Sequence, residues 1–247
     1  MMHLRSVMGV LATCAITAKL GSVLVVFCWV PRRYKLFDRC STLWSRVILG
    51  SIGVKVSVSG LEHLDTRNPA IYMVNHQSLL DTPILFGHVS PALRFVAKKS
   101  LRWVPFMGWA MALNDFVFID RQQRGSAIAS LDRAGDKIAS GTSVLVFPEG
   151  TRGPGEQLLP FKKGGFMLAL KAQVPIVPLR LTGTPALLPK GSLLPASGSV
   201  HLAIGPAIPT AGMTTAQRDE LMERVRQAIE ALPRSPQEAV AASPAPV

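Results

Sequence analysis

The sequence of 247 residues has few aromatic residues, 6% of the total, and only three cysteines. With so few aromatic side chains, and without a zinc-finger, homeodomain or RNA-binding signature, nucleic acid is the least favoured class of partner. Cys14, Cys28 and Cys40 have neither CxxC nor metal-ligand spacing, so no disulfide framework, metal site or thiol active site is predicted. The Gly-x-Ser-x-Gly motif of many serine hydrolases is also missing.

Acidic residues are scarce as well: 15 Asp and Glu stand against 27 Lys and Arg, which gives a formal charge of +12. This excess predicts anionic partners such as phosphate groups or acidic lipid headgroups. Apolar residues make up 48% of the chain, charged residues 17%, and the mean hydropathy is +0.30. Such a composition indicates contact with a phospholipid bilayer. The length fits one α/β domain with an anchor.

Residues 7–30 form a long apolar run in which Lys19 is the only charge. As a helix this run is about 36 Å long, and the hydrocarbon core of a bilayer is about 30 Å thick. Two arrangements stay open. The run either spans the bilayer, or bends at Gly21 and lies in one leaflet while Lys19 reaches the headgroups. It is too long for a cleaved signal peptide.

Basic residues follow this run, whereas Arg5 alone precedes it; they are Arg32, Arg33, Lys35 and Arg39. The positive-inside rule therefore predicts a domain on the cytoplasmic face of the membrane. Residues 36–53 read as a second, amphipathic helix, which lies on the bilayer or packs on the domain core. We assign residues 1–53 to a membrane-anchoring helical segment.

From residue 54 onward, short apolar strands alternate with helical segments. This pattern predicts an α/β fold with a central, mostly buried sheet of about seven strands flanked by helices. The predicted strands are 54–60, 70–76, 92–98, 115–121, 142–150, 174–183 and 199–205, and the predicted helices 79–88, 101–113, 126–140, 166–172 and 215–232. Residues 187–198 are expected to form a loop. The domain thus covers 54–232, and 233–247, rich in Pro, Ala and Ser, is predicted to be a disordered tail.

The segment 71–81, IYMVNHQSLLD, begins as a buried strand, turns polar at Asn75 and His76, and continues as a helix. His76 therefore stands at the carboxyl end of a strand, where α/β sheets display reactive side chains. Asp81 lies five residues further on, so the two cannot share a helical face. They meet only if His76 precedes the helix and Asp81 is in its first turn. The carboxylate then fixes the tautomer, which leaves the other ring nitrogen as a base.

A structural alternative exists for both residues. Ser78-x-x-Asp81 is also a capping-box pattern, in which Asp81 only accepts hydrogen bonds from backbone N–H groups at the start of the helix. A histidine at a strand end is often a hydrogen-bonded core residue. Both alternatives stay open on these residues alone.

Three further blocks place charged residues after predicted strands or at the start of a helix, close to the predicted position of His76. Arginine guanidinium groups, lysines and the N–H groups of a helix start all bind phosphate oxygens. The blocks together predict a site for a phosphorylated substrate. They contribute Arg121 and Arg124, then Glu149, Thr151 and Arg152, and finally Lys162 and Lys163 before a Gly pair.

Four sequence blocks in this order resemble those of the lysophosphatidic acid acyltransferases, within the glycerolipid acyltransferase superfamily. NHQSLLD matches the N-H-x4-D motif, and FVFIDR, FPEGTR and VPIVPL match the second, third and fourth blocks. The similarity covers about residues 54–209. Asn114-Asp115 stand where many members have a Gly, and Leu179 replaces a commoner Val or Ala.

The resemblance implies that His76 is the general base and Asp81 its orienting partner. His76 would remove the proton from the sn-2 hydroxyl of a 1-acyl-glycerol 3-phosphate while that oxygen attacks the thioester of acyl-CoA or acyl-carrier protein. The product is phosphatidic acid, a phospholipid precursor, and no acyl-enzyme is needed. The partners implied are therefore a membrane lipid acceptor, an acyl thioester donor and the bilayer, without cofactor or metal.

The resemblance also implies an acceptor side, on which arginine pairs with phosphate. Glu149 cannot bind phosphate, so it would hold an arginine or accept a glycerol hydroxyl. The implied acceptor residues are Arg121, Glu149, Gly150, Thr151 and Arg152, with Lys98 as a further phosphate candidate.

Three other functions remain open. One is an acyltransferase for another acceptor, such as lyso-ornithine lipid or glycerol 3-phosphate. The second is a serine hydrolase that uses Ser78 beside His76. The third is a non-enzymatic basic protein of the membrane surface.

Overall fold

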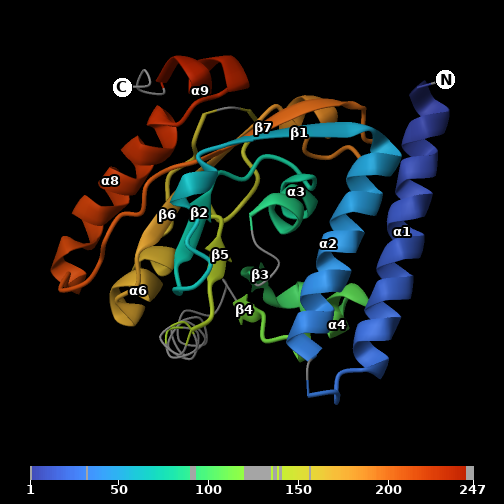
Figure 1. The fold of residues 1–247 in the computed structure, drawn as a ribbon, viewed down its shortest axis with the longest axis horizontal. Helices are drawn as coiled ribbons and strands as arrows, with labels where there is room; N and C mark the ends of the chain where they lie inside the picture. The colour runs from blue at the N-terminus through green and yellow to red at the C-terminus, as the bar shows by residue number, and fades with distance from the viewer. Residues whose placement is uncertain are drawn as a thin grey trace.

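A seven-stranded sheet forms the centre of the computed structural model, which describes residues 2–31, 33–89, 93–119, 135, 138, 141–155 and 157–242 (Figure 1). The strand order is β1-β7-β6-β2-β5-β3-β4. Neighbouring strands are parallel except β6 and β7. All seven predicted strands are present: β1 Val54–Ser59, β2 Ile71–Val74, β3 Arg94–Lys98, β4 Val117–Ile119, β5 Val144–Val146, β6 Ile176–Thr182 and β7 Gly198–Ile204.

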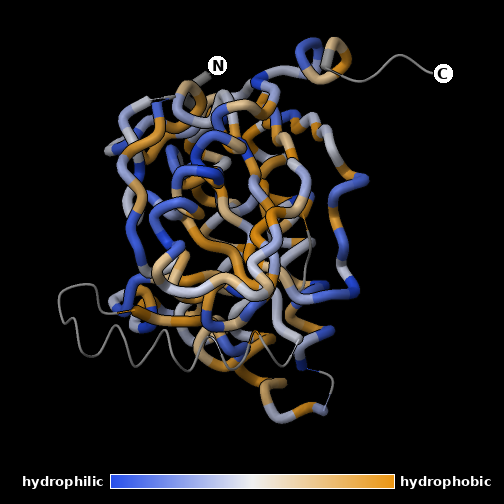
Figure 2. The backbone as a smooth tube through the Cα atoms, turned by 90° about the vertical axis from the view of Figure 1, so that its left-hand side faces the viewer, coloured by the Kyte–Doolittle hydropathy of each residue, from blue (hydrophilic) through white to orange (hydrophobic). Residues whose placement is uncertain are grey.

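Helices cover both faces of this sheet, so its strands carry apolar side chains on both sides. In β2, Tyr72 and Val74 join one apolar cluster, whereas Ile71 and Met73 join the other, because successive side chains of a strand point to opposite faces. Figure 2, which views the molecule from the α8 side, shows apolar chain at the centre and mostly polar chain outside. One face carries α1 Met2–Val26, α2 Arg33–Ile52, α3 Asp81–His88 and α4 Met107–Leu113; the other carries α6 Lys163–Ala172 and α8 Arg218–Ala231 (Figure 1).

The helix predicted over 101–113 is divided into a 3₁₀ helix, η2 Lys99–Trp103, and α4. The cause is Pro105. A residue that precedes proline avoids the helical region, and Val104 is extended, with ψ of 120°. Phe106 then takes a positive φ of 62° before α4 begins. The helix predicted over 126–140 lies outside the described residues, apart from helical positions 135 and 138, and Arg121 and Arg124 also lie outside them.

The C-terminal region contains two short helices that were not predicted, α7 Thr184–Leu187 and α9 Pro236–Ala242. Residues 188–197 form the predicted loop after α7, and η3 Thr215–Gln217 leads into α8 as expected. The segment predicted to be a disordered tail contains α9. Its start is well capped: the Ser235 hydroxyl accepts the Glu238 N–H, and the Glu238 carboxylate accepts the Arg234 N–H. Proline at the first helical position also favours this helix.

The first two helices form an antiparallel pair against the domain. α2 buries Phe37, Ile48 and Leu49 in the core that it shares with α3. Of the two predicted arrangements, on the bilayer or on the domain core, the structure shows α2 packed on the core. α1 runs along α2 (Figure 1). Along the described chain, α1 is the only helix that is long and apolar enough to cross a membrane by length and composition.

α1 contacts the domain over most of its length. The Ser6 hydroxyl donates to the Pro195 carbonyl, and the Trp44 indole N–H donates to the Thr17 hydroxyl. Further along, Gly21 lies so close to Phe106 that a Cβ at this position would be 2.7 Å from its side chain. Residues 6 to 21 of a helix extend over about 22 Å. α1 therefore lies against the domain rather than leading away from it.

Candidate active site

His76 occupies the turn between β2 and α3, at the carboxyl end of the strand. β2 ends at Val74 and α3 begins at Asp81, so the His76 ring meets Asp81 as the five-residue spacing requires. Nδ1 of His76 lies 2.8 Å from Oδ2 of Asp81. The imidazole stacks on the Phe147 ring, with centroids 3.9 Å apart and an interplanar angle of 21°. A carboxylate oxygen can only accept, so Nδ1 carries the hydrogen and Nε2 is left with a lone pair.

Asp81 both orients the histidine and holds the turn that precedes α3. Its fully buried Oδ2 atom accepts the backbone N–H groups of Gln77 and Ser78 at 2.7 and 2.9 Å, besides the His76 ring. The orienting role is therefore present, and of the capping-box alternative only the contact with the Ser78 N–H is found, since no side chain caps the first turn of α3. Three donors on one oxygen hold the His76 ring in a single orientation.

The strand end below His76 is fixed by Asn75. Its buried side chain donates to the Leu181 carbonyl at 2.8 Å and accepts the Leu181 N–H at 2.7 Å, which ties the end of β2 to β6. The prediction did not assign a role to Asn75, because its partner is 106 residues away.

Glu149 supports the backbone of His76 and of the loop beyond. One carboxylate oxygen accepts the His76 N–H at 2.7 Å, and the other accepts the Leu159 N–H at 2.9 Å. Burial raises the pKa of the Glu149 carboxyl, whereas these two N–H groups lower it. Among the described residues no arginine side chain forms a hydrogen bond with this carboxylate. A contact of Glu149 with an arginine or with a glycerol hydroxyl of the acceptor stays a prediction, because each carboxylate oxygen can accept a further hydrogen bond.

Two further hydrogen bonds join the turn after Glu149 to the turn that contains His76. The Gly153 N–H donates to the His76 carbonyl at 2.8 Å, and the Gln77 side chain donates to the Gly155 carbonyl. Gly150 has a φ of 71°, which favours glycine and lets the chain turn directly after Glu149. The two turns therefore form one hydrogen-bonded unit.

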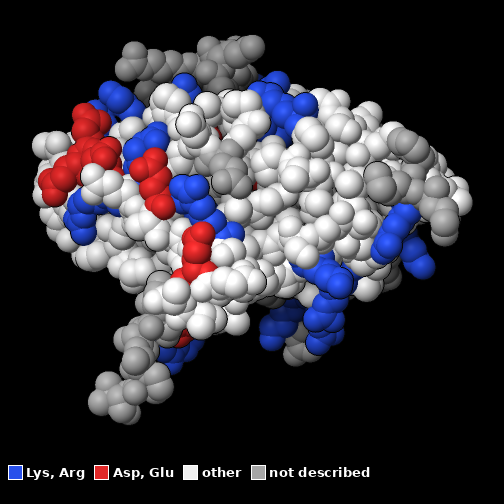
Figure 3. All heavy atoms as spheres, turned by 90° about the horizontal axis from the view of Figure 1, so that it is seen from above, with Lys and Arg blue, Asp and Glu red and all other residues white. Residues whose placement is uncertain are grey.

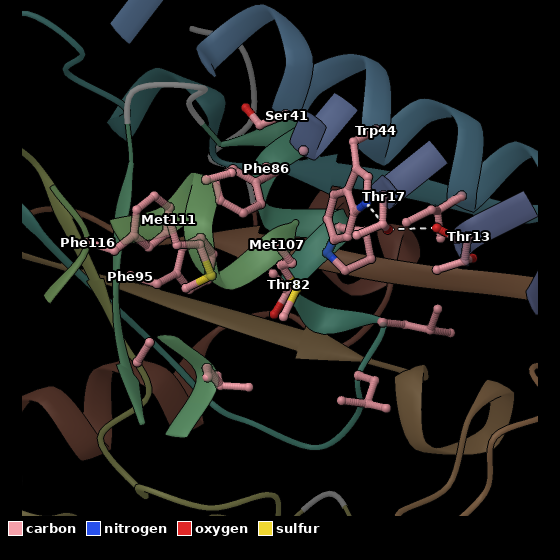
Figure 4. Close-up of a pocket in the computed structure, with 18 of the residues that line it drawn as sticks. Thr13, Thr17, Ser41, Trp44, Thr82, Phe86, Phe95, Met107, Met111 and Phe116 are labelled. Carbon is pink, nitrogen blue, oxygen red and sulfur yellow. Dashed lines mark hydrogen bonds between the residues drawn. The ribbon is translucent and has the colours of Figure 1, made fainter. Parts of the chain in front are cut away.

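An apolar cavity of about 830 Å³ opens beside His76. Its volume falls in the range of sites for small organic ligands. α1 to α4 form its walls: Figure 4 shows Thr13, Thr17 and Trp44 on one side and Phe86, Phe95 and Phe116 on another. The predicted residues that reach this cavity, beside His76, are Lys98, Gly150, Thr151 and Arg152.

Lys98 and Arg152 reach the cavity from different elements. Lys98 ends β3 and is exposed, and Arg152 belongs to the turn after β5 and is half-buried. The Arg152 carbonyl accepts a hydrogen bond from Lys190. Among the described residues, none forms a hydrogen bond or ion pair with the Arg152 guanidinium. Lys162 and Lys163, at the start of α6, do not line the cavity, so the structure does not bring them to this site.

The serine-hydrolase alternative finds no support in this geometry. The buried Ser78 hydroxyl donates to the Leu188 carbonyl and accepts the Leu80 N–H, so it does not face His76 as a nucleophile would. Within the described part of the chain, no three His, Cys, Asp or Glu side chains are grouped as metal ligands.

Comparison with known proteins connects this geometry to a family. Residues 55–182 match the family model described as Acyltransferase. The chain is 36% identical over 230 residues to the 1-acyl-sn-glycerol-3-phosphate acyltransferase of Saccharomyces cerevisiae, which covers 91% of the chain and 75% of the yeast protein. A protein of the same name from Chlamydomonas reinhardtii is 38% identical over 179 residues, 71% of the chain, but the chain spans only 52% of that relative.

A solved structure is similar over nearly the whole chain. The crystal structure of the 1-acyl-sn-glycerophosphate acyltransferase PlsC from Thermotoga maritima superimposes with a TM-score of 0.78 and 28% identity, and covers 92% of this chain and 94% of that one. The similarity in structure extends well beyond residues 55–182, which the family model matches.

Proposed function

The chain belongs to the acyltransferase family, and from this premise we propose that it transfers a fatty acyl group from a thioester to the sn-2 hydroxyl of 1-acyl-sn-glycerol 3-phosphate. The observation that carries the proposal is the position of the His76–Asp81 pair at an apolar cavity whose lining also includes Lys98 and Arg152. A lipid phosphate combines the apolar chain and the anionic group that such a site binds. The donor is acyl-CoA or acyl-carrier protein, and the product is phosphatidic acid.

His76 performs the proton transfers in the proposed mechanism. Nε2 takes the proton of the acceptor hydroxyl as its oxygen attacks the thioester carbonyl, and Asp81 stabilises the imidazolium that results. The tetrahedral intermediate then collapses, the carbon–sulfur bond breaks, and the leaving thiolate takes the proton from the imidazolium. The new ester contains the acyl group, His76 is neutral again, and the donor leaves as a thiol.

The acceptor phosphate pairs with cations at the mouth of the cavity. Arg152 offers a planar guanidinium that matches two phosphate oxygens, and Lys98 adds a second charge. Thr151 and Gly150 line the same region. Arg121, which lies outside the described residues, is proposed as a further phosphate partner.

A panel of acceptor lipids tests the proposed function directly. Purified protein is given a labelled acyl thioester and, in turn, lysophosphatidic acid, lyso-ornithine lipid, glycerol 3-phosphate and no acceptor. We expect label to enter lipid product with lysophosphatidic acid at a rate well above the others. Faster labelling of lyso-ornithine lipid or glycerol 3-phosphate would show that this compound is the acceptor instead. Release of free fatty acid would indicate a hydrolase. No consumption of thioester would indicate a non-enzymatic protein of the membrane surface.

The N-terminal helix pair supports a proposal about location. We propose that α1 lies in the outer part of one leaflet on the cytoplasmic side, because its contacts with the domain extend from Ser6 to Gly21. A helix that crossed the bilayer would have to leave those contacts. Its exposed stripe is apolar and includes Leu4, Met8 and Leu11, as a helix embedded in a leaflet requires.

Arg152→Ala is expected to raise the KM for lysophosphatidic acid about ten- to a hundredfold and to change the donor KM little. A charge-assisted hydrogen bond contributes about 1.5–3 kcal/mol, which corresponds to that loss of binding. Arg152→Lys should restore part of the affinity, since a point charge lacks the two-pronged geometry. Initial rates at varied acceptor and donor concentrations measure both constants. A loss confined to the donor KM would place the donor's phosphates at Arg152 instead.

Glu149→Gln is the contrasting variant for this measurement. An amide keeps the size of the side chain but replaces one acceptor oxygen by a donor, so either the His76 or the Leu159 N–H loses its partner. This variant should lower kcat and leave the acceptor KM nearly unchanged, because Glu149 contacts the backbone and not the cavity.

A further inference from the structure

The segment η2–α4 exposes large apolar side chains within seven residues. Trp103 is 75% exposed and Trp109 is 44% exposed, and Val104 and Phe106 between them are 38% and 37% exposed. Isolated exposed apolar residues are common, but a continuous group with two tryptophans marks a contact surface. Tryptophan is also enriched where an apolar phase meets water, because the ring is apolar and its N–H is polar.

The same segment is basic and contains no acidic residue. Residues 82–114 contain no Asp or Glu, and Lys98, Lys99 and Arg102 flank the exposed group. The α1–α2 pair adds to this charge, since Asp38 is the first acidic residue of the chain. Figure 3 shows the contrast on one face: Asp and Glu gather on the α8 side, and the α1–α2 side shows Lys and Arg. Such a surface matches anionic headgroups.

α4 also adjoins the N-terminal helix pair. Gly21 of α1 packs directly on Phe106, and the Tyr34 hydroxyl at the start of α2 hydrogen-bonds the carboxylate of Asp115 just beyond α4. Exposed Phe27 and Trp29 follow α1. The exposed part of η2–α4 is therefore continuous with the apolar surface of the helix pair.

The inner side of the segment lines the cavity. Leu101, Met107 and Met111 face the cavity, whereas Trp103 and Trp109 are not part of its lining (Figure 4). A single layer of chain thus separates the cavity from the exposed apolar group. An element with these two sides fits the boundary between a lipid phase and a lipid-binding cavity.

We propose that η2–α4 is a second membrane-contacting element, whose Trp103 and Trp109 insert among the headgroups of an anionic bilayer. It acts beside the N-terminal helices and belongs to the domain itself. The wall of the cavity then lies at the bilayer surface. Lipid chains can therefore move between the bilayer and the cavity without passing through bulk water. The inference deepens the proposed function, but binding to vesicles that contain no substrate tests it separately.

The test uses the four tryptophans of the full chain as reporters. Variants that keep Trp103 or Trp109 alone, with phenylalanine at the other three positions, are mixed with phosphatidylcholine–phosphatidylglycerol vesicles that have brominated acyl chains. A Trp-free variant with Leu61→Trp is the matched control, because Leu61 is 56% exposed in η1 Leu61–His63, away from α1 and α4. We expect a blue shift and quenching for Trp103 and Trp109, and neither for the control. Quenching of a Trp29-only variant without quenching of Trp103 would overturn the proposal.

Binding affinity gives the second measurement. Trp103→Ser with Trp109→Ser should weaken sedimentation with the anionic vesicles about tenfold, since interfacial binding follows the apolar area inserted. The paired control, Leu61→Ser with Val240→Ser, removes two exposed apolar side chains and should bind as the native chain does. Turnover on detergent-dispersed substrate should stay unchanged in both. Unchanged vesicle binding with a raised KM for acyl-carrier protein would mean a protein docking surface, and would overturn the bilayer contact.

Discussion

His76→Ala should abolish turnover while the protein remains folded. A positioned general base contributes about 10²–10⁴-fold to a rate. Among the described residues that line the cavity, no other side chain is placed to act as the base instead of His76 Nε2. Single-turnover rates with saturating thioester and lysophosphatidic acid measure the loss directly. Thermal unfolding followed by circular dichroism should show a transition close to that of the native chain.

His63→Ala is the matched control, because this partly exposed histidine lies in η1 and does not line the cavity. Its rate should equal that of the native protein. A rate for His76→Ala above about a tenth of the native rate would exclude the general-base role. Loss of the unfolding transition in His76→Ala would instead assign His76 to the core, the structural alternative that the sequence leaves open.

Asp81→Asn should lower kcat by about 10²–10⁴-fold with a small change in stability. The amide oxygen can take the place of Oδ2 and still accept the N–H groups of Gln77 and Ser78, which keeps the turn before α3 in place. What the amide removes is the negative charge beside the imidazole. That charge stabilises the imidazolium at the moment when His76 holds the substrate proton.

Asp81→Ala separates the two roles of this carboxylate. Without any acceptor at this position the N–H groups of Gln77 and Ser78 lose their partner too, and a buried donor left without a partner costs about 1–3 kcal/mol. Denaturant unfolding of both variants, together with kcat, therefore distinguishes charge from capping. If Asp81→Asn were less stable but normally active, Asp81 would only cap the helix.

The local patterns of the sequence predicted the strands and the geometry of the dyad. The strands are bounded by polar or turn residues, and the central strands β2, β5 and β6 are mostly apolar, so a local pattern is enough to place them. The offset of five residues between His76 and Asp81 allows one arrangement, and the structure has it. The division at Pro105 was also readable, since proline restricts the residue before it.

The role of Glu149 was not readable from the sequence. The motif gives a carboxylate next to Thr151 and Arg152, which suggests a substrate contact. Its actual partner is the His76 N–H, 73 residues away, and every residue but proline offers a backbone N–H. The contact of α1 with the domain could not be predicted from the sequence either. The apolar stripe of α1 suits a bilayer, and only the fold shows that another side of the helix faces Phe106.

The pairing of β1 with β7 has a consequence for synthesis. Ser57 and His201, which meet across these strands, are 144 residues apart. At typical translation speeds the ribosome needs on the order of ten seconds to make that length. In the first part of this interval α1 and α2 have been made, while the α4 segment and the later strands that pack against their inner faces have not. A nearby bilayer is the one apolar phase that can take up those faces, so this topology favours membrane contact before the sheet closes.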